Sequence, residues 1–408
     1  DCCQTDRVMP EPQKMNPRSR QERRSKAPAP RKPGEKECFV QVAGSLENYA
    51  AIELQELGAS IVRSVPRGIY IRAEARSLYR IVYESRLAQR LLYPLSVFDC
   101  HSEKYLYRQA FTQVDWTKLF SPEETFAIEA NVSSSHIRHS LYASQLLKDA
   151  ICDQFREAVG KRPDFDPKEP DLVLSLHIHQ NRAQISLDLG GGSLHKRGYR
   201  VRAGAAPLQE TLAAAIIRAS GWQGEEPLID PMCGSGTLLA EALMHYCRIP
   251  AAYLREKSGL KYLPDYDPKL WEEVKKEANR AIRPLPEGLI RGSDISHANL
   301  EIATENLSRL PYGYEILLRT ADFMKLKAYN GRFIVTNPPY GIRIGEGGTI
   351  AQLYNDLGAW LRAECSGSTA VILCGSLELA TELKLRHRWL KNFKNGDLDT
   401  VLGKFLLR

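Results

Sequence analysis

The tetrapeptide Asn337-Pro338-Pro339-Tyr340 combines residue types that can bind a planar amine, and it closes a short apolar run at 332–336. The Asn337 side chain offers an amide oxygen and Pro338 offers a backbone carbonyl, while the proline ring fixes the backbone and removes a donor. Tyr340 adds a flat aromatic face. The set therefore suits a group with an exocyclic amine, such as a nucleobase, although a strand end followed by an ordinary turn has the same residue types.

A second segment has the pattern of a cofactor cradle. The apolar residues 227–229 predict a short buried strand, and a helix is predicted from Leu238 to Tyr246. Between them lies a turn, Asp230-Pro231-Met232-Cys233-Gly234-Ser235-Gly236-Thr237. Glycines let a ligand approach the backbone, and the free N–H groups of a helix start point at its acceptors. This pattern predicts a cofactor site at the carboxyl edge of a parallel sheet.

The residues in this turn narrow the choice of cofactor. The chain has no phosphate-binding Gly-x4-Gly-Lys-Ser/Thr sequence here, and Leu239 stands where a dinucleotide fingerprint would have its third glycine. The carboxylate of Asp230 would repel a pyrophosphate but attract an ammonium group. S-adenosylmethionine carries an ammonium group, so these residues favour it.

Two more acids follow predicted strand ends. Asp294 in Gly292-Ser293-Asp294 is placed to accept hydrogen bonds from ribose hydroxyls, and Asp322 in Ala321-Asp322-Phe323 is placed to meet an adenine. A single acid at such a place is more often a cap or turn former. Acids after three successive strands, with Asn337 after the fourth, indicate one shared site.

The elements before residue 207 predict two smaller α+β modules. A strand at 38–42, a helix at 46–57, strands at 60–65 and 68–73 and a helix at 76–85 form a ferredoxin-like pattern. A strand at 125–130, a helix at 141–159 and strands at 172–179 and 183–189 follow. We therefore predict a basic disordered tail at 1–37, modules at 38–100 and 101–190, a linker at 191–206 and an α/β domain at 207–408.

Cations gather at three places ahead of the α/β domain. Arg138 lies in a Ser/His/Arg patch at 133–140, which suits phosphate but equally suits a helix N-terminus capped by serines. Lys196, Arg197 and Arg200 lie in a Gly-rich connector that suits either a nucleic-acid backbone or a solvated linker. The tail is consistent with an RNA-binding arm or a plain disordered leader.

Composition excludes several classes of protein. Of 408 residues 43% are hydrophobic and the mean hydropathy is −0.35, and no apolar run is long enough to span a membrane. Nine scattered cysteines without a C-x-x-C pair argue against a disulfide framework or a zinc site and favour the cytoplasm. We expect no metal, because His177 and His179 lack a third ligand of suitable spacing. A net charge of +7 permits a polyanionic partner.

The C-terminal segment completes the expected sheet. Residues 370–374 predict a buried strand, and the segments 389–394 and 399–407 flank an Asn395-Gly396 pair, which is a strong hairpin signal. Antiparallel strands at this end fit the α/β architecture.

Taken together, these motifs resemble a known family. Asp-Pro-x-Cys-Gly-Ser-Gly-Thr followed by Asn-Pro-Pro-Tyr is similar to class I S-adenosylmethionine-dependent methyltransferases that act on an exocyclic base nitrogen. The segments 194–200 and 206–216 resemble bacterial methyltransferases of the 23S ribosomal RNA that modify guanine N2. The resemblance covers 38–408 and implies a Rossmann-like catalytic domain preceded by ferredoxin-like and THUMP RNA-binding domains. In some members a second methyltransferase follows, and we expect this chain to stop too soon to hold one.

The resemblance also implies a role for each site residue. Asp230 and the turn from Cys233 to Thr237 would hold the methionine part of the cofactor, Asp294 its ribose and Asp322 its adenine. Asn337 and the Pro338 carbonyl would accept hydrogen bonds from guanine N2, and Tyr340 would stack on the base. Cys233 is expected to line the turn and not to act as a nucleophile. The products would be the methylated guanine and S-adenosyl-L-homocysteine.

Three rival functions stay open at the level of sequence. Transfer RNA would serve as substrate for an enzyme of the same build. Asn-Pro-Pro-Tyr suits adenine N6 of DNA as well as guanine N2, although such enzymes carry a target-recognition domain where this chain resembles THUMP. A non-catalytic RNA-binding assembly factor is disfavoured by the intact acids.

Overall fold

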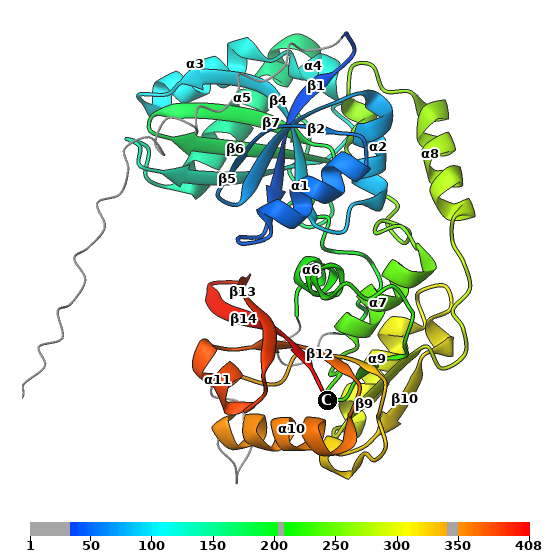
Figure 1. Cartoon of the computed structure of the whole chain (residues 1–408). Helices are drawn as coiled ribbons and strands as arrows, with labels where there is room; N and C mark the ends of the chain where they lie inside the picture. Colours follow the sequence, from blue (N-terminus) through cyan, green and yellow to red (C-terminus); the bar gives the residue numbers. More distant parts are fainter. Residues whose placement is uncertain (1–32, 203–207, 341–349) are drawn as a thin grey trace, which may run out of the picture. The chain divides into compact units, whose positions relative to one another are not determined.

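A computed structural model describes residues 33–202, 208–340 and 350–408 and shows two sheets of seven strands each (Figure 1). The predictions for the tail at 1–32, for the end of the linker at 203–206 and for residue 207, the first of the α/β domain, lie outside the described residues. The tail was expected to reach residue 37, but the first strand already begins at Lys36. The side chain of Glu37 pairs there with Arg72 of a neighbouring strand.

The N-terminal sheet has the strand order β2-β3-β1-β4-β7-β6-β5. Its elements are β1 (Lys36–Val42), α1 (Glu47–Glu56), β2 (Ser60–Val65), β3 (Gly68–Ala73), α2 (Ala75–Glu84), β4 (Ala88–Asp99), α3 (Glu103–Gln113), α4 (Trp116–Leu119), β5 (Phe126–Ser133), α5 (Ser140–Val159), β6 (Leu172–His179) and β7 (Arg182–Asp188). The first four strands and two helices have the order of a ferredoxin-like module, as predicted.

Strand β4 joins the two predicted N-terminal modules into one sheet, and the sequence did not reveal it. It pairs with β1 on one side and with β7 on the other, antiparallel in both cases. Pro94 interrupts its middle, at a register shift against β7, and most of its side chains are only partly buried. Proline and weak apolar alternation both lower a strand signal, so this strand is visible only through its partners.

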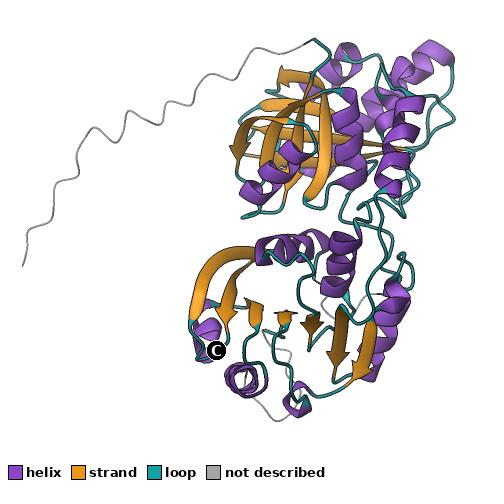
Figure 2. Ribbon diagram, turned by 45° about the vertical axis from the view of Figure 1, so that its right-hand side comes forward, coloured by secondary structure: helices purple, strands orange, loops and turns teal. Residues whose placement is uncertain are grey.

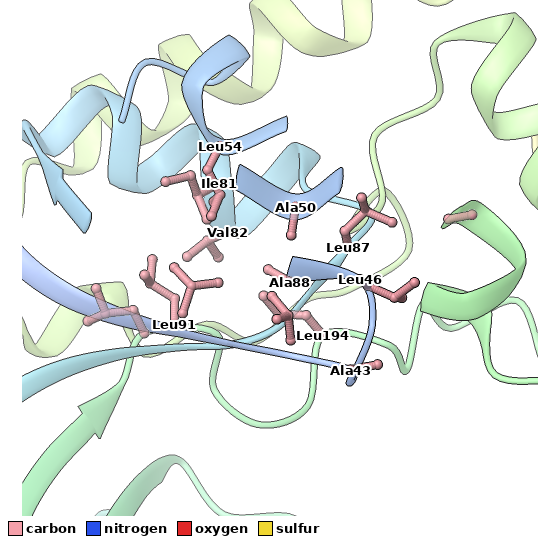
Figure 3. Close-up of a cluster of buried hydrophobic side chains, with 14 of the residues drawn as sticks. Ala43, Leu46, Ala50, Leu54, Ile81, Val82, Leu87, Ala88, Leu91 and Leu194 are labelled. Carbon is pink, nitrogen blue, oxygen red and sulfur yellow. The ribbon is translucent and has the colours of Figure 1, made fainter. Parts of the chain in front are cut away.

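The connector begins inside the N-terminal core. Figure 3 shows Leu194 among apolar side chains of α1, α2 and β4, including Leu54, Val82 and Leu91. Leu194 is buried, and its backbone N–H donates to the Gln89 carbonyl over 2.8 Å. The first residues after β7 are therefore packed against the N-terminal module, in contrast to the solvated linker that composition allowed.

The C-terminal sheet has the order β10-β9-β8-β11-β12-β14-β13. Its elements are α6 (Glu210–Ser220), β8 (Leu228–Asp230), α7 (Thr237–Cys247), α8 (Pro268–Arg280), β9 (Ile290–Asp294), α9 (His297–Leu307), β10 (Leu317–Thr320), the short 3-10 helix η4 (Phe323–Lys325), β11 (Phe333–Thr336), α10 (Ile350–Glu364), β12 (Thr369–Cys374), α11 (Leu377–Glu382), β13 (His387–Asn395) and β14 (Leu398–Leu406). Strands β8 to β12 pair in parallel, and β14 is antiparallel to its neighbours.

Helices cover both faces of this sheet (Figure 2). Successive residues of a strand point to opposite faces. Phe333 and Val335 belong to the same buried cluster as α6 and α7, and Ile334 between them belongs to a second cluster with α10 and α11. A parallel sheet buried on both faces is the Rossmann-like architecture that was predicted.

The C-terminal hairpin is also confirmed, with one refinement. Asn395 pairs with Leu398, so the loop consists of Gly396 and Asp397, and Asn395 is the last residue of β13. Gly396 has a φ of +62°, as the first loop residue of a tight hairpin requires. Among the described residues, no helix is long and apolar enough to cross a lipid bilayer.

Candidate active site

The predicted site residues meet at the carboxyl ends of β8, β9, β10 and β11. The strand order reverses between β8 and β11, which is where open α/β sheets bind their ligands. The strand ends are tied together by hydrogen bonds: the Cys233 N–H donates to the Ser293 carbonyl over 2.9 Å, and the Ala321 N–H donates to the Asp294 carbonyl over 3.0 Å. The topology thus brings residues that are about a hundred positions apart in sequence to one edge.

The turn after β8 is shaped by glycines and held by an acid. Gly234 and Gly236 have φ angles of +53° and +81°, a region that costs other residues strain. Gly236 caps the start of α7. The Asp294 carboxylate accepts hydrogen bonds from the Gly234 N–H over 2.9 Å, from the Ser296 N–H over 2.9 Å and from the Asn299 amide over 3.2 Å. Asp294 therefore fixes the turn as well as ending its own strand.

Asp230 is a buried acid with few partners. It is 1% exposed, and one carboxylate oxygen accepts hydrogen bonds from the Thr336 hydroxyl over 2.7 Å and from the Met232 N–H over 3.1 Å. Burial raises the pKa of Asp230 to about 7, against the lowering effect of those two hydrogen bonds, and nearby Asp294 raises it further. A carboxylate in this position is ready to gain a cationic partner.

This buried acid should make stability depend on pH. Between about pH 4 and 7 the unfolded chain has ionised Asp230 while the folded chain keeps it protonated, so the free energy of unfolding falls as pH rises, by at most about 1.4 kcal/mol per pH unit. Asp230→Asn removes this loss. We measure the free energy of unfolding of the ligand-free protein in urea at pH 5 and at pH 8. The difference between the variant and the parent should favour the variant more at pH 8 than at pH 5. An equal difference at both pH values would contradict the assignment.

Cys233 is buried in the turn, 6% exposed. Burial raises the pKa of its thiol well above the usual value, and the carboxylates of Asp230 and Asp294 raise it further. A thiol that stays protonated is a poor nucleophile. That Cys233 lines the cofactor turn and is not a nucleophile stays a proposal.

Arg200, predicted to contact RNA, instead braces the turn from inside. Its guanidinium donates to the Glu210 carboxylate over 2.8 Å, to the Leu208 carbonyl over 2.9 Å and to the Thr237 hydroxyl over 3.1 Å. A longer contact of 3.5 Å reaches the Ser235 hydroxyl. Arg200 thereby links the start of α6 to the first turn of α7.

Arg197 is buried more deeply. It is 2% exposed and lies 3.4 Å from the carboxylate of Glu241 on α7, and it donates to the Leu194 carbonyl over 2.9 Å. A guanidinium enclosed in this way has no face for a phosphate. The sequence shows that these residues are cationic, but it does not show that their acidic partners lie on helices later in the chain.

Removing the Arg200 guanidinium should destabilise the domain. Arg200→Met leaves the buried Glu210 carboxylate unpaired, and breaking such a pair costs about 3 kcal/mol. The double variant Arg200→Met/Glu210→Gln should recover much of that loss because it removes the unpaired charge. Urea unfolding at pH 7 measures both. A double variant no more stable than the single would rule out this bracing role.

Asn337 follows directly after β11, as predicted, and its amide oxygen is unsatisfied. The Oδ1 atom is buried and accepts no hydrogen bond from any residue that the structure describes. Native proteins leave few buried acceptors unpaired, because each costs about 1–3 kcal/mol. Pro338 beside it is buried and Pro339 is exposed. An unpaired acceptor fixed between a strand and two prolines is what a donor ligand needs.

Tyr340 is clamped at both ends of its side chain. Its hydroxyl accepts a hydrogen bond from the Asn395 amide at the end of β13. At its base, a Cβ added to Gly375 would lie 2.5 Å from the Cβ of Tyr340, so only glycine fits there. Sequence reasoning named Tyr340 and the hairpin separately, and no local signal connected them.

The remaining predicted residues lie nearer the surface. Asp322 caps η4 by accepting from the Met324 N–H over 3.0 Å and is half-buried. Arg138 and Lys196 are exposed, so both stay proposals for RNA contact. The serines before α5 do not cap it; Ser135 instead accepts from the Asn181 N–H over 3.0 Å and fastens the patch to the β6–β7 turn.

Two polar residues of the site were missed by sequence reasoning. Thr336 holds Asp230, as described above, and Asn306 ties the connector to the cofactor turn. Asn306 is 1% exposed; its side chain accepts from the Val201 N–H over 2.9 Å and donates to the Ser235 carbonyl over 3.2 Å. The only local signal for it would have been an asparagine between the apolar residues Ala303 and Leu307 of the segment that forms α9. Among the described residues, no group of three or more His, Cys, Asp or Glu side chains is arranged to hold a metal.

Comparison with protein families matches every part of this architecture. The family described as RMKL-like, methyltransferase domain, matches residues 197–404. The THUMP domain family matches residues 101–188, and the RlmL ferredoxin-like domain family matches residues 37–92.

Curated relatives include two kinds of protein. The Ribosomal RNA large subunit methyltransferase K/L of Photobacterium profundum is 36% identical over 368 residues, which is 89% of this chain and 52% of that protein. A putative RNA methyltransferase of Synechocystis is 36% identical over 371 residues, 90% of this chain and 96% of that protein. The chain thus spans about half the length of the K/L relative and nearly all of the Synechocystis relative.

Solved structures share the fold. SMU.472, a putative methyltransferase solved in complex with SAH, has a TM-score of 0.80 at 22% identity and covers 92% of this chain and 99% of that one. A possible methylase from Clostridium difficile 630 has a TM-score of 0.77 at 24% identity, covering 92% and 98%. TrmN from Thermus thermophilus has a TM-score of 0.61 at 18% identity, covering 91% and 99%.

Proposed function

We propose that this chain, which belongs to the RMKL-like methyltransferase family, transfers a methyl group from S-adenosyl-L-methionine to N2 of a guanine in 23S ribosomal RNA. The observation that carries the proposal is the buried Oδ1 of Asn337 at the carboxyl edge of the sheet, which accepts no hydrogen bond from the part of the chain that the structure describes. An exocyclic amine is a hydrogen-bond donor that would satisfy this atom.

The cofactor side of the site fits S-adenosylmethionine. Asp230, buried and short of partners, suits the ammonium of the methionine part, and the glycine turn allows its backbone to approach closely. Asp294 keeps lone pairs for ribose hydroxyls beside its bonds to the turn, and Asp322 lies after the next strand, where the adenine is expected. When bound, this cofactor supplies an electrophilic methyl group on a sulfonium sulfur.

The chain's own contribution to the transfer is positioning. Asn337 Oδ1 and the Pro338 carbonyl accept from the two N–H bonds of the amine, which directs its lone pair away from the base plane and toward the methyl group. Correct placement of two reacting groups contributes much of a rate enhancement by itself. The new nitrogen–carbon bond would form as the methyl–sulfur bond breaks, which leaves S-adenosyl-L-homocysteine, and the positively charged nitrogen would then release its proton to solvent. Tyr340 offers the ring on which an unstacked base can rest.

The choice of ribosomal RNA rests on the relatives. The K/L proteins are named as methyltransferases of the large-subunit ribosomal RNA, and the Synechocystis relative is named as an RNA methyltransferase. The THUMP match supports RNA over DNA, and exposed Arg138 and Lys196 are available to contact its phosphates. The guanine N2 assignment rests on the resemblance of the flanking motifs, because Asn-Pro-Pro-Tyr suits adenine N6 equally well. Guanine N2 of transfer RNA is the second candidate.

Transfer of tritiated methyl groups tests the proposal. The protein is incubated with labelled S-adenosylmethionine and, separately, with unmodified 23S ribosomal RNA, transfer RNA and duplex DNA, and the products are digested to nucleosides. We expect N2-methylguanosine from 23S ribosomal RNA. N2-methylguanosine from transfer RNA alone would favour the second candidate. N6-methyladenosine, or no product from any RNA, would overturn the proposal.

A further inference from the structure

The amide of Asn395 makes a contact that hairpin formation does not require. The tight turn needs Gly396, and Asn395 pairs with Leu398 through its backbone as an ordinary strand residue. Its side chain is free for another task, and it donates to the hydroxyl of Tyr340 across a separation of 55 positions in sequence.

The face of β13 that carries Asn395 is anchored along its length. Residues 391, 393 and 395 lie on the same face of the strand, because successive side chains point to opposite faces. Phe393 is 1% exposed and its ring packs against Tyr49 of α1, with centroids 5.9 Å apart. The Lys391 ammonium donates to the Tyr49 hydroxyl over 2.7 Å. Because Lys391 and Phe393 fix the strand, Asn395 has little freedom to shift, and its amide holds the Tyr340 hydroxyl in one place.

The ring of Tyr340 is consequently held from two sides. Gly375 leaves just enough room for the Cβ of Tyr340, and Asn395 holds the hydroxyl at the other end of the side chain. An aromatic ring attached by two rotatable bonds would otherwise sample several orientations. A base that must present its amine to Asn337 needs a stacking surface in one orientation, because small errors in placement cost rate.

We infer that Asn395 is a positioning residue for methyl transfer, which fixes the orientation in which Tyr340 stacks on the target base. The inference rests on the proposed function for the role of Tyr340, but the contact itself can be tested without any substrate. Asn395 lies outside the Asn-Pro-Pro-Tyr motif, and the side-chain hydrogen bond that the structure gives it is the one to Tyr340.

A double-mutant cycle tests the inference. Asn395→Ala and Tyr340→Phe each remove one partner of the same hydrogen bond, so each should lower kcat about three- to tenfold with the affinity for S-adenosyl-L-homocysteine unchanged. The double variant should be no slower than the slower single variant. Asn395→Gln, which keeps an amide donor, should recover part of the rate. Asp397→Ala, in the exposed loop of the same hairpin, should leave kcat unchanged. Multiplicative losses in the double variant, or an unchanged kcat in Asn395→Ala, would overturn the inference.

A spectroscopic measurement separates this inference from the proposed function. The 13C resonance of the tyrosine ring carbon bonded to oxygen reports hydrogen bonding at the hydroxyl, and Tyr340→Phe identifies its signal. Asn395→Ala should shift that resonance and Asp397→Ala should not, whether or not any RNA is methylated. An unshifted resonance in Asn395→Ala would refute the contact. A shifted resonance in a protein that methylates no RNA would uphold the contact and refute the proposed function.

Discussion

Replacing Asn337 by alanine should lower kcat for methyl transfer by about a hundred- to a thousandfold, the cost of deleting one preorganised group at a reacting centre. The Oδ1 atom is buried and has no hydrogen-bond partner among the described residues, so the site already bears the cost of holding it ready for a donor. Alanine removes the acceptor while leaving β11 and the two prolines unchanged. Single-turnover rates with tritiated S-adenosylmethionine, at saturating RNA and cofactor, measure the chemical step directly.

Two further measurements define what Asn337 does. The affinity for S-adenosyl-L-homocysteine, measured by calorimetry, should change less than about threefold in Asn337→Ala, because Asp230, Asp294 and the turn are untouched. Asn337→Asp keeps an acceptor oxygen of the same reach and should retain more activity than the alanine variant. Collapse of cofactor binding in Asn337→Ala would mean that the residue supports the cofactor pocket, and the division of roles proposed above would be wrong.

The strand ends of the site were predictable because their signals are local. Asp230 and Asn337 each follow a short apolar run, Asp294 ends a short strand with the sequence Ile-Arg-Gly-Ser-Asp, and the carboxyl ends of parallel strands share one edge. Spacing along the chain is enough to place such residues together once the sheet is parallel. The same reasoning gave the ferredoxin-like module and the C-terminal hairpin, whose turn residues are adjacent in sequence.

The partners of charged side chains were not predictable in this way. Arg197 and Arg200 stand in a polar, Gly-rich stretch that indicates an exposed connector, yet both guanidinium groups face acids on helices α6 and α7. A sequence shows the charge but not the distant acid that buries it. Leu194 carried a local hint, because it is an apolar residue in a polar stretch, and it proved to be part of the N-terminal core.

Residues that join two elements also escaped prediction. Strand β4 has weak apolar alternation and a proline in its middle, and it is held in the sheet by its pairing with β1 on one side and β7 on the other. The contact between Asn395 and Tyr340 depends on how the hairpin of β13 and β14 pairs at the edge of the sheet beside β12, which no short window of sequence records. Both cases are tertiary effects that override local pattern.

Replacing Asp294 by alanine should weaken cofactor binding by about a hundredfold or more. A carboxylate that accepts from two ribose hydroxyls makes hydrogen bonds to a charged group, each contributing about 1.5–3 kcal/mol. The same carboxylate accepts from the N–H of Gly234 and from the N–H of Ser296, so its loss also frees the turn that lies against the cofactor. Both effects act on binding, and therefore the dissociation constant for S-adenosyl-L-homocysteine should rise with KM for S-adenosylmethionine.

The matched control is Glu301→Ala on α9, which makes the same change of net charge at a largely exposed acid. It should leave the dissociation constant within about twofold, because exposed charges at a distance are screened. Asp294→Asn separates the two roles of the carboxylate: it keeps one oxygen acceptor for the turn but loses the charge, so binding should fall between the parent and the alanine variant. If Asp294→Ala lowers thermal stability yet leaves the affinity unchanged, the carboxylate serves only the turn, and the ribose must be held by other residues of this sheet edge.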